Sequence, residues 1–305
     1  MLQRYDERNA GLRYWVNGVL RHRDEPGISP FDSVVQGGDA VWEGLRLYEG
    51  RIFGLAEHLA RLRRSAAALG FAAVPAVEDV IAAVVATLRA NDMWDGVHVR
   101  LTLTRGVKLT SGMDPRLNQQ GCTLIVLAEH KPPVYETTGL RLITASVRRP
   151  GPDVLDPKIH HNNLLNSILA KMEANVAGAD DALMLDGRGF VAETNATHLF
   201  AVIDGILTTP HAVACPEGIT RRTVLSLAAE AGIPTAVRDV SLAEMYASAE
   251  VFCTGTMGEI AAVVEIDGRT VADGSVGELT GRISTLYQSH VHAHGTPVLP
   301  GPPAT

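Results

Sequence analysis

The chain has 305 residues, which predicts two domains at about 150 residues per domain. Hydrophobic residues make up 46%, charged residues 20%, and the net charge is −7. Because lysine and arginine form no dense run, nucleic acid is not an expected partner. The N-terminus lacks the apolar core of a signal peptide, and no stretch is long enough to predict a membrane span. Cys122, Cys215 and Cys253 are widely spaced and form no CxxC pair, which is typical of a protein of the reducing cytoplasm.

The first part of the chain predicts an antiparallel sheet with helices packed against it. The hairpin at 14–20 turns at Asn17-Gly18, a signal for a two-residue turn. The other predicted elements are a hairpin at 44–55, helices at 55–69 and 78–90, and strands at 97–106 and 122–129.

After a proline-containing linker at 130–139, the pattern mixes strands and helices. The predicted elements are strands at 140–147, 181–185, 189–193, 198–203 and 250–254, a helix at 164–177 and a helix from Ile219. The tail from about 289 is rich in Pro, His and Gly, which predicts a loose segment.

The stretch DPKIHHNN, residues 156–163, concentrates chemically active side chains. Lys158 in a turn could be a nucleophile, because burial lowers the pKa of a lysine. His160 and His161 have no carboxylate or cysteine partner at the usual zinc spacing, so a polar turn leading into the next helix is predicted for them. A metal site using both histidines is the alternative.

Two segments suit an anion, although the chain has neither a GxxxxGK[ST] nor a GxGxxG motif. PEGITRR (216–222) puts a glycine before a helix, so the N–H groups of Ile219 and Thr220 point outward. CTGTMGE (253–259) ends a buried strand with small and hydroxyl residues. Each segment alone is weak evidence for an anion site, because a glycine before a helix is often part of an ordinary turn.

Four further residues are open to two interpretations each. Glu193 follows an apolar strand and would either cap a turn or face a buried cation. Arg61 lies on a predicted helix and would either be solvated or form a fork for an anion. His98 and Arg100 share one face of a strand, which suits a substrate carboxylate or an exposed sheet edge.

The order of these pieces resembles the class IV (fold type IV) pyridoxal-phosphate aminotransferases, from about residue 14 to residue 287. The segments that carry the resemblance are WEGLRLYEGRIFGLAEHLARL, VRLTLTRG, PKIHHNNLLNSILAKMEA, DDALMLDGRGFVAETNATHLF, DGILTTP, PEGITRRTV and CTGTMGEIAAVVEIDG. The resemblance implies an α+β fold of two domains, with a smaller N-terminal α/β domain at 1–129 and a larger cofactor-binding domain at 140–288 that has a β-barrel-like core. It also implies a homodimer.

The resemblance implies a role for each site residue. Lys158 would form the Schiff base with pyridoxal 5′-phosphate, and Glu193 would pair with the pyridine nitrogen. The phosphate would be held by Arg61, by Ile219 and Thr220, and by Thr256. The substrate side would be lined by Trp42, Arg46, His98, Arg100, Met257 and Gly258.

The implied reaction is a ping-pong transamination between an amino acid and a 2-oxo acid. His98-x-Arg100 lies where branched-chain enzymes carry Tyr-x-Arg, which favours an apolar L-amino acid with 2-oxoglutarate. The chain departs from the family at Asn163 and His198, and its spacing after Lys158 is about a residue longer. A D-amino-acid or (R)-amine transaminase and an aminodeoxychorismate lyase-type enzyme are therefore alternatives. A metal hydrolase and a non-catalytic relative are the more distant rivals.

Overall fold

The computed structural model describes residues 5–133, 135 and 139–302. The chain divides into two compact units, which are described separately. The N-terminal unit contains residues 5–132, 159–163 and 292–302, and the C-terminal unit contains the described residues of 133–158 together with 164–291. The linker predicted at 130–139 includes residues 134 and 136–138, which lie outside the described residues.

The N-terminal unit is built on a seven-stranded antiparallel sheet with the order β16-β4-β3-β5-β6-β1-β2. Its strands are β1 Arg13–Val16, β2 Val19–His22, β3 Ala40–Tyr48, β4 Arg51–Ile52, β5 Val97–Thr104, β6 Thr123–His130 and β16 Thr296–Pro297. The predicted turn at Asn17-Gly18 joins β1 to β2, and both residues have positive φ, as this turn requires. Its helical segments are the 3₁₀ turns Glu7–Asn9 and Pro115–Leu117, α1 Ser33–Gly37, α2 Leu55–Ala68 and α3 Val77–Ala90.

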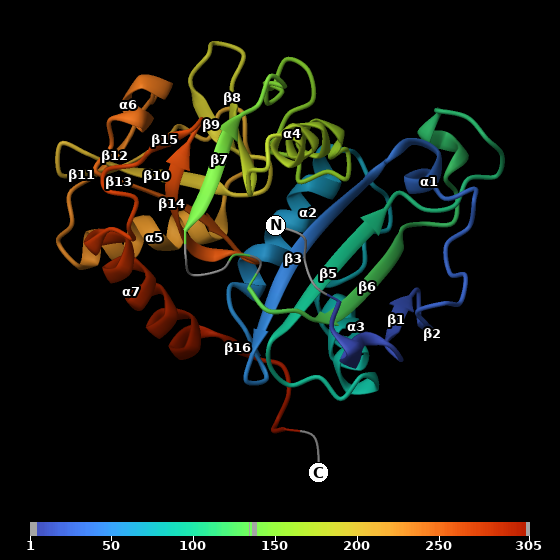
Figure 1. The fold of residues 1–305 in the computed structure, drawn as a ribbon. Coiled ribbons are helices and arrows are strands. Elements are labelled where there is room, and N and C mark those ends of the chain that lie inside the picture. The colour runs from blue at the N-terminus through green and yellow to red at the C-terminus, as the bar shows by residue number, and fades with distance from the viewer. Residues whose placement is uncertain (1–4, 134, 136–138, 303–305) are drawn as a thin grey trace. The chain divides into compact units, whose positions relative to one another are not determined.

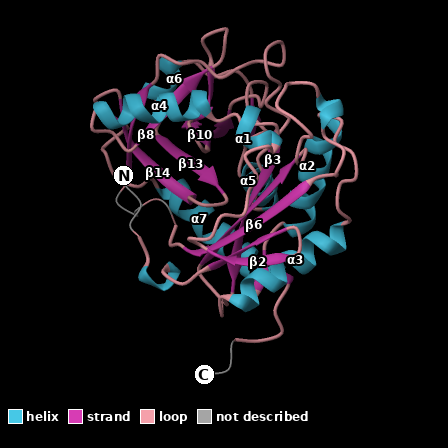
Figure 2. Cartoon of the chain, turned by 90° about the vertical axis from the view of Figure 1, so that its right-hand side faces the viewer, coloured by secondary structure: helices cyan, strands magenta, loops and turns pink. Residues whose placement is uncertain are grey.

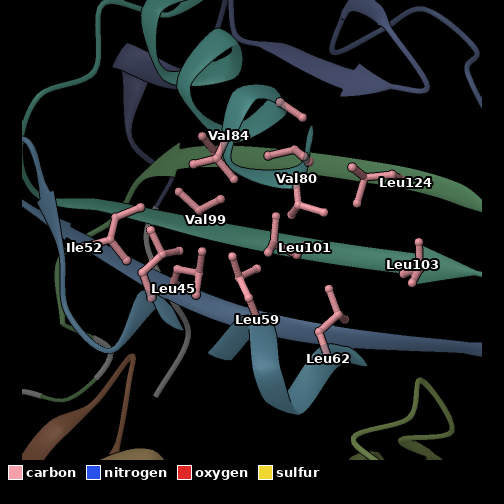
Figure 3. Packing of buried hydrophobic residues seen from close by; sticks show 14 of the residues in the cluster. Leu45, Ile52, Leu59, Leu62, Val80, Val84, Val99, Leu101, Leu103 and Leu124 are labelled. Carbon is pink, nitrogen blue, oxygen red and sulfur yellow. The ribbon is translucent and has the colours of Figure 1, made fainter. Parts of the chain in front are cut away.

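The core of this unit follows from strand alternation. Val41, Leu45 and Leu47 of β3 and the odd-numbered residues of β5 face α2 and α3 (Figures 2 and 3). The even-numbered residues of β3 and β5 share the opposite face, where Gly44 pairs with Arg100 and Arg46 pairs with His98. This second face carries Trp42, Arg46, His98 and Arg100, four of the six residues for which the sequence analysis gives a substrate role.

The C-terminal unit contains a curled sheet with the order β12-β11-β10-β13-β14-β7-β8-β9, and β15 pairs with β14. Its strands are β7 Leu140–Thr144, β8 Asp181–Leu185, β9 Val191–Thr194, β10 His198–Ile203, β11 Ile206–Thr209, β12 Thr235–Val237, β13 Glu250–Gly255, β14 Glu259–Ile266 and β15 Arg269–Thr270. Its helices are α4 Leu165–Val176, α5 Ile219–Glu230, α6 Leu242–Tyr246 and α7 Glu278–His294, of which the last three residues count with the N-terminal unit.

Alternating side chains divide this unit into an inner and two outer cores. Leu199 and Val251 belong to the inner cluster, whereas Phe200 and Phe252 stack at 5.1 Å in an outer cluster with residues of α5 and α7. The alanines of α4 pack against β8 in the other outer cluster (Figure 1). Among the described residues, none of the helices combines the length and apolarity needed to cross a bilayer.

The tail differs from the sequence prediction of a loose segment at 289–305. Helix α7 continues to His294, with Val291 buried, and β16 pairs with β4. Val298 and Leu299 pack against the core of the N-terminal unit and donate backbone hydrogen bonds to Gly50. The composition, biased toward Pro, His and Gly, does not indicate that these few apolar residues pack against the rest of the protein.

Candidate active site

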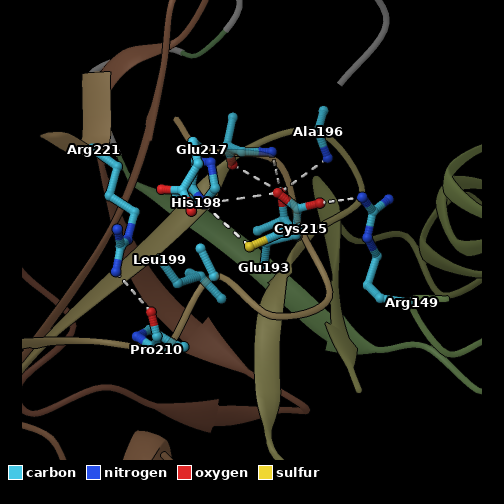
Figure 4. Close-up of polar contacts among 12 residues, drawn as sticks. Arg149, Glu193, Ala196, His198, Leu199, Pro210, Cys215, Glu217 and Arg221 are labelled. Carbon is cyan, nitrogen blue, oxygen red and sulfur yellow. Dashed lines mark hydrogen bonds and ion pairs between the residues drawn. The ribbon is translucent and has the colours of Figure 1, made fainter. Parts of the chain in front are cut away.

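A buried carboxylate is the centre of the polar cluster in the C-terminal unit. Glu193 lies on β9, and its Oε1 is 2.5 Å from Nη2 of Arg149. The side chain of Glu193 is only 6% exposed, and Nδ1 of His198 lies 3.8 Å from Oε2 (Figure 4). Of the two interpretations left open by the sequence, Glu193 therefore faces a buried cation.

His198 joins this carboxylate to the loop that precedes α5. Sγ of Cys215 lies 3.8 Å from Nδ1 of His198, and burial raises the pKa of the Cys215 thiol, so the thiol stays protonated. A Cβ added to Gly218 would lie 2.3 Å from the His198 ring, so a larger residue there would have to displace this ring. Glu193, His198 and Cys215 are close enough together to ligate a metal, but the Arg149 guanidinium already occupies the carboxylate.

The first turn of α5 is an open helix N-terminus. Gly218 is the N-cap and supplies no side-chain hydrogen bond, and Ile219 and Thr220 are buried. The first N–H groups of a helix have no acceptor within the helix, and they favour an anion. Arg221 is not available to this turn, because its Nη2 donates to the carbonyl of Pro210 at 2.9 Å.

The end of β13 lies beside His198. Thr254 pairs with His198 across the β10–β13 ladder, and its buried hydroxyl has no hydrogen-bond partner among the described residues. Thr256 and Met257 are half-buried in the turn that follows, and Gly258 is buried. A Cβ on Gly258 would lie 2.4 Å from the ring of Tyr135, so this turn is backed by an aromatic side chain.

Lys158 is not the buried lysine that the sequence left open as a nucleophile. Its side chain is 39% exposed, and Nζ lies 2.6 Å from the carboxylate of Glu217. Nζ also donates to the carbonyls of Ala212 and Cys215. Lys158 therefore contacts the loop that ends at the N-cap of α5, with its nitrogen held by three oxygen acceptors.

A second buried carboxylate organises the N-terminal unit. Glu43 is fully buried on β3 and receives hydrogen bonds from Arg61 Nε at 2.8 Å and Nη2 at 2.7 Å. Nδ1 of His58 lies 2.7 Å from the same carboxylate. Burial alone would raise the pKa of Glu43, but the bonds from Arg61, His160 and His58 hold it well below its usual value. Arg61 therefore lies in a buried ion pair and not on a solvated helix face.

Trp42 lies between a cation and an imidazole. The Arg100 guanidinium is 4.1 Å from one ring centroid of Trp42, and the His160 ring stacks on Trp42 at 4.3 Å. Trp42 Nε1 also donates to the carbonyl of His161 at 3.1 Å. His160 lies in the connection that leads from the turn at 157–159 to α4, as the sequence predicts, and its ring is largely enclosed by Trp42 and Glu43.

His98, one of the predicted substrate residues, has a buried ring nitrogen that makes no hydrogen bond among the described residues. This nitrogen is Nε2, and the residue as a whole is buried. Burial, with the charges of Lys131, Arg100 and Arg46, lowers its pKa to about 3. His98 is therefore neutral at pH 7, on a sheet face rich in positive charge.

The structure brings the predicted residues together in two sets. Lys158, Glu193 and Gly218–Thr220 meet around the 212–217 loop of the C-terminal unit, while Trp42 and Arg100 meet in the N-terminal unit. Sequence reasoning missed Glu43, His58, Arg149, Cys215 and Glu217. For Glu43 a signal existed, because a carboxylate at a core-facing position of an alternating strand requires a buried cation.

The family model described as amino-transferase class IV matches residues 40–266. The chain belongs to the class IV aminotransferase family. The resemblance identified from the sequence is thereby confirmed. The matched range includes Glu43, Glu193 and the first turn of α5.

The relatives of this class IV chain include branched-chain aminotransferases, proteins named after them, and a D-alanine aminotransferase of Bacillus licheniformis that is 31% identical over 287 residues, covering 92% of this chain and 97% of that protein. The chain is 52% identical over 291 residues to branched-chain-amino-acid aminotransferase-like protein 2 of Arabidopsis thaliana, covering 95% of this chain and 52% of that protein. It therefore spans about half the length of that relative. It is 40% identical to a putative branched-chain-amino-acid aminotransferase of Methanocaldococcus jannaschii, covering 91% of this chain and 96% of that protein.

Solved structures confirm the predicted fold class. The T.th. branched-chain amino acid aminotransferase, complexed with N-(5′-phosphopyridoxyl)-L-glutamate, has a TM-score of 0.86 and 33% identity, covering 93% of this chain and 95% of that chain. The enzyme of Thermoproteus uzoniensis with norvaline has a TM-score of 0.85 and 30% identity, covering 95% of this chain and 100% of that chain. The two-unit α+β architecture with a curled sheet is the fold type IV arrangement.

Proposed function

We propose that this chain is a pyridoxal 5′-phosphate-dependent aminotransferase that acts on an apolar or branched-chain L-amino acid with a 2-oxo acid such as 2-oxoglutarate. The observation that carries the proposal is the pairing, in a class IV chain, of a buried carboxylate with an open helix N-terminus. Nδ1 of His198 lies 3.8 Å from Oε2 of Glu193, and a Cβ added to Gly218 would lie 2.3 Å from the same ring. A cofactor with a basic ring nitrogen and a phosphate needs these two groups.

The residues present fit the cofactor by their chemistry. The hydroxyl of Thr254, which has no hydrogen-bond partner among the described residues, and the uncapped N-terminus of α5 supply unused donors. Gly218 lies so close to the His198 ring that a larger side chain would displace this ring. We propose that Ile219, Thr220 and Thr256 hold the phosphate. Arg61 would add positive charge, although its Nε and Nη2 are bonded to Glu43.

We propose that Glu193 keeps a proton on the ring nitrogen, while Arg149 keeps Glu193 in place. Lys158 would be the covalent anchor, and Glu217, 2.6 Å from Nζ, is placed to accept the proton that this amine must lose. When bound, the cofactor supplies an electron sink for the pair of electrons left as the Cα–H bond of the substrate breaks.

The substrate side of the proposal rests on the N-terminal sheet and on the turn after β13. Arg46, His98 and Arg100 present donors and positive charge for carboxylates, and Trp42 supplies an apolar wall. Met257 and Gly258 would contribute their N–H groups. This donor set favours an amino acid over an (R)-amine, which has no carboxylate.

We propose in addition that the chain acts as a homodimer in the cytoplasm. Support for a dimer comes from α4, where Leu165, Ile168, Met172 and Val176 are each more than half exposed along one side. A contiguous apolar stripe on a helix is typical of an interaction surface. The wide spacing of the three free cysteines supports the location.

The proposal is tested by loading the chain with the cofactor and then profiling donors. We expect the loaded chain to show the visible absorbance of a lysine-linked cofactor, and Lys158→Ala to lose it. With 2-oxoglutarate as acceptor, L-leucine should react faster than D-alanine and (R)-1-phenylethylamine. A wild-type chain that remains colourless after loading would contradict the proposal.

Two controls separate the rivals. Activity lost to a chelator would favour the metal hydrolase, and an unchanged rate after chelation would oppose it. Among the described residues, no cluster of three possible metal ligands includes His160 or His161. A chain that binds the cofactor but turns over none of the donors would favour the non-catalytic relative.

A further inference from the structure

The turn after β13 is a three-residue hairpin loop whose two ends are fixed within the C-terminal unit. Gly255 pairs with Glu259 across the β13–β14 ladder, which leaves residues 256–258 as the loop. Glu259 is buried with a φ of 52°, a left-handed value that is uncommon for a residue other than glycine. Its carboxylate accepts a hydrogen bond from Nε2 of Gln288 on α7. The strand ladder and α7 therefore hold the ends of the loop.

The ring of Tyr135 packs against the last residue of this loop. A Cβ added to Gly258 would lie 2.4 Å from Cε2 and 2.5 Å from Cδ2 of the ring, which is too close for either atom to stay in place. Gly258 does not have a positive φ, so its backbone conformation is open to other residues. The contact with Tyr135 is therefore the physical reason for a glycine at this position.

The hydroxyl of Tyr135 anchors the ring to the sheet. It donates to Oδ2 of Asp181, the first residue of β8, at 2.5 Å. Asp181 is 4% exposed, and its Oδ1 lies 3.1 Å from Nζ of Lys171 on α4, which supplies the cation that a buried carboxylate needs. Burial and the charge of Asp181 raise the pKa of Tyr135 well above its usual value, so the hydroxyl keeps its proton and donates. The ring cannot move away from the loop without breaking this bond.

We propose that Tyr135 is a positioning residue of the substrate side: its ring holds Met257 and Gly258 in place, and Asp181 holds the ring. The inference rests on the proposed function, in which the N–H groups of Met257 and Gly258 bind the substrate. All of these residues belong to the C-terminal unit. Because Tyr135 acts through the loop and not on the reacting atoms, it sets how tightly the donor binds and not how fast the chemical step runs.

Tyr246 provides a matched control for substitutions of Tyr135. Its hydroxyl donates to Oδ2 of Asp267 at 2.7 Å, so Tyr246→Phe also removes a bond from tyrosine to a carboxylate in the C-terminal unit. Asp267 follows the last residue of β14, whereas the loop at 256–258 precedes the first. The control therefore makes the same chemical change at the opposite end of the same strand.

The closing experiment measures the half-reaction of each cofactor-loaded chain with L-leucine as the loss of visible absorbance. We expect Tyr135→Ala to raise the half-saturating L-leucine concentration about tenfold or more and to keep the maximal rate within about threefold of wild type. Tyr135→Phe keeps the ring and should raise this concentration less, by about threefold. Tyr246→Phe and Tyr246→Ala should leave both values within about threefold of wild type. An unchanged half-saturating concentration in Tyr135→Ala, or a loss of maximal rate alone, would overturn the inference.

A double-mutant comparison tests the contact itself. Gly258→Ala in the wild-type background forces the ring or the loop to move and should raise the half-saturating concentration about tenfold. In the Tyr135→Ala background the added methyl group has room, and the same substitution should change this concentration by less than about threefold. Equal effects in the two backgrounds would overturn the proposed contact.

A third readout needs neither cofactor nor substrate. Backbone ¹⁵N relaxation in the unloaded chain reports the order parameters of Met257 and Gly258. We expect values of about 0.85 in wild type and in Tyr246→Ala, and values below about 0.6 in Tyr135→Ala. Phe252, in the middle of β13, should stay near 0.85 in every chain. A loop that is already mobile in wild type, or one that stays rigid in Tyr135→Ala, would overturn the positioning role.

The remaining outcomes separate the inference from the proposed function. A wild-type chain that stays colourless or converts no donor would overturn the proposed function and the substrate role of the loop, and the relaxation data would still decide whether Tyr135 holds the loop. If Tyr135→Ala does not fold, Tyr135→Leu takes its place with the same expectations, because leucine retains apolar volume but has neither the ring nor the hydroxyl.

Discussion

Nη2 of Arg149 lies 2.5 Å from Oε1 of Glu193, and the two side chains are 13% and 6% exposed. This pair is the most buried ion pair of the C-terminal cluster that involves an arginine. Arg149 comes from the segment between β7 and α4, and Glu193 comes from β9. The pair therefore ties the segment that leads to Lys158 to the curled sheet.

Arg149→Met should destabilise the protein, because it leaves the Glu193 carboxylate buried without its cation. Removing one partner of a buried pair costs about 3–5 kcal/mol. Arg238→Met is the matched control, since Arg238 and Glu244 are 40% and 37% exposed, and such surface pairs contribute about 0–1 kcal/mol. Urea unfolding of both variants tests this prediction. Equal losses would contradict the assigned role of Arg149.

His98 should make stability fall as the pH is lowered. Its pKa is about 3 in the folded chain because of burial and the nearby charges of Lys131, Arg100 and Arg46, and it is near 6.5 in the unfolded chain. Between these values the unfolded chain binds a proton that the folded chain does not, so stability is full above pH 6.5 and declines below it. From pH 6.5 to 5, wild type should lose about 2 kcal/mol more than His98→Gln. Parallel curves over this range in urea unfolding would refute the prediction.

The C-terminal segment should contribute to the stability of the N-terminal unit. Leu299 packs against its core, whereas Thr296 is exposed. Leu299→Asp should cost about 2 kcal/mol, from lost burial and the desolvation of a carboxylate. Thr296→Asp should change the free energy of unfolding by less than about 0.5 kcal/mol. A loose tail, as composition predicts, would make both substitutions neutral.

The apolar stripe of α4 should be covered in the proposed dimer. Met172 is 56% exposed on this stripe, and Met113 is 99% exposed elsewhere. Met172→Glu should shift the chain toward the monomer, because the charge would be buried in the interface. Met113→Glu makes the same chemical change outside the stripe and should leave the dimer intact. Sedimentation velocity distinguishes the two, and a dimer that survives Met172→Glu would exclude this stripe.

The elements were predictable where a single periodicity dominates. The odd-numbered residues of β5 and the turn at Asn17-Gly18 follow from alternation and from turn chemistry. The tail was not predictable, because only Val291, Val298 and Leu299 anchor it in a sequence biased toward Pro, His and Gly. Local composition cannot predict that β16 pairs with β4, because β4 lies far from it in the sequence.

The candidate site was predictable in its residue types and less so in its pairings. Glu193 and the turn before α5 were identified, but the sequence does not show that Arg149 pairs with Glu193 or that Arg61 pairs with Glu43. These partners are 44 and 18 residues apart in the chain, and no short motif joins them. The contacts of His160 were not predictable either, because they come from Trp42 and Glu43 on another element.

The most direct test of the central claim is the half-reaction with a single donor. The cofactor-loaded chain is mixed with excess L-leucine and no acceptor, and both products are measured by mass spectrometry. A ping-pong aminotransferase should release one equivalent of the leucine oxo acid per active site, convert its cofactor to pyridoxamine 5′-phosphate, and then stop until 2-oxoglutarate is added. Absence of both the oxo acid and the amine form of the cofactor would contradict the assignment of aminotransferase activity.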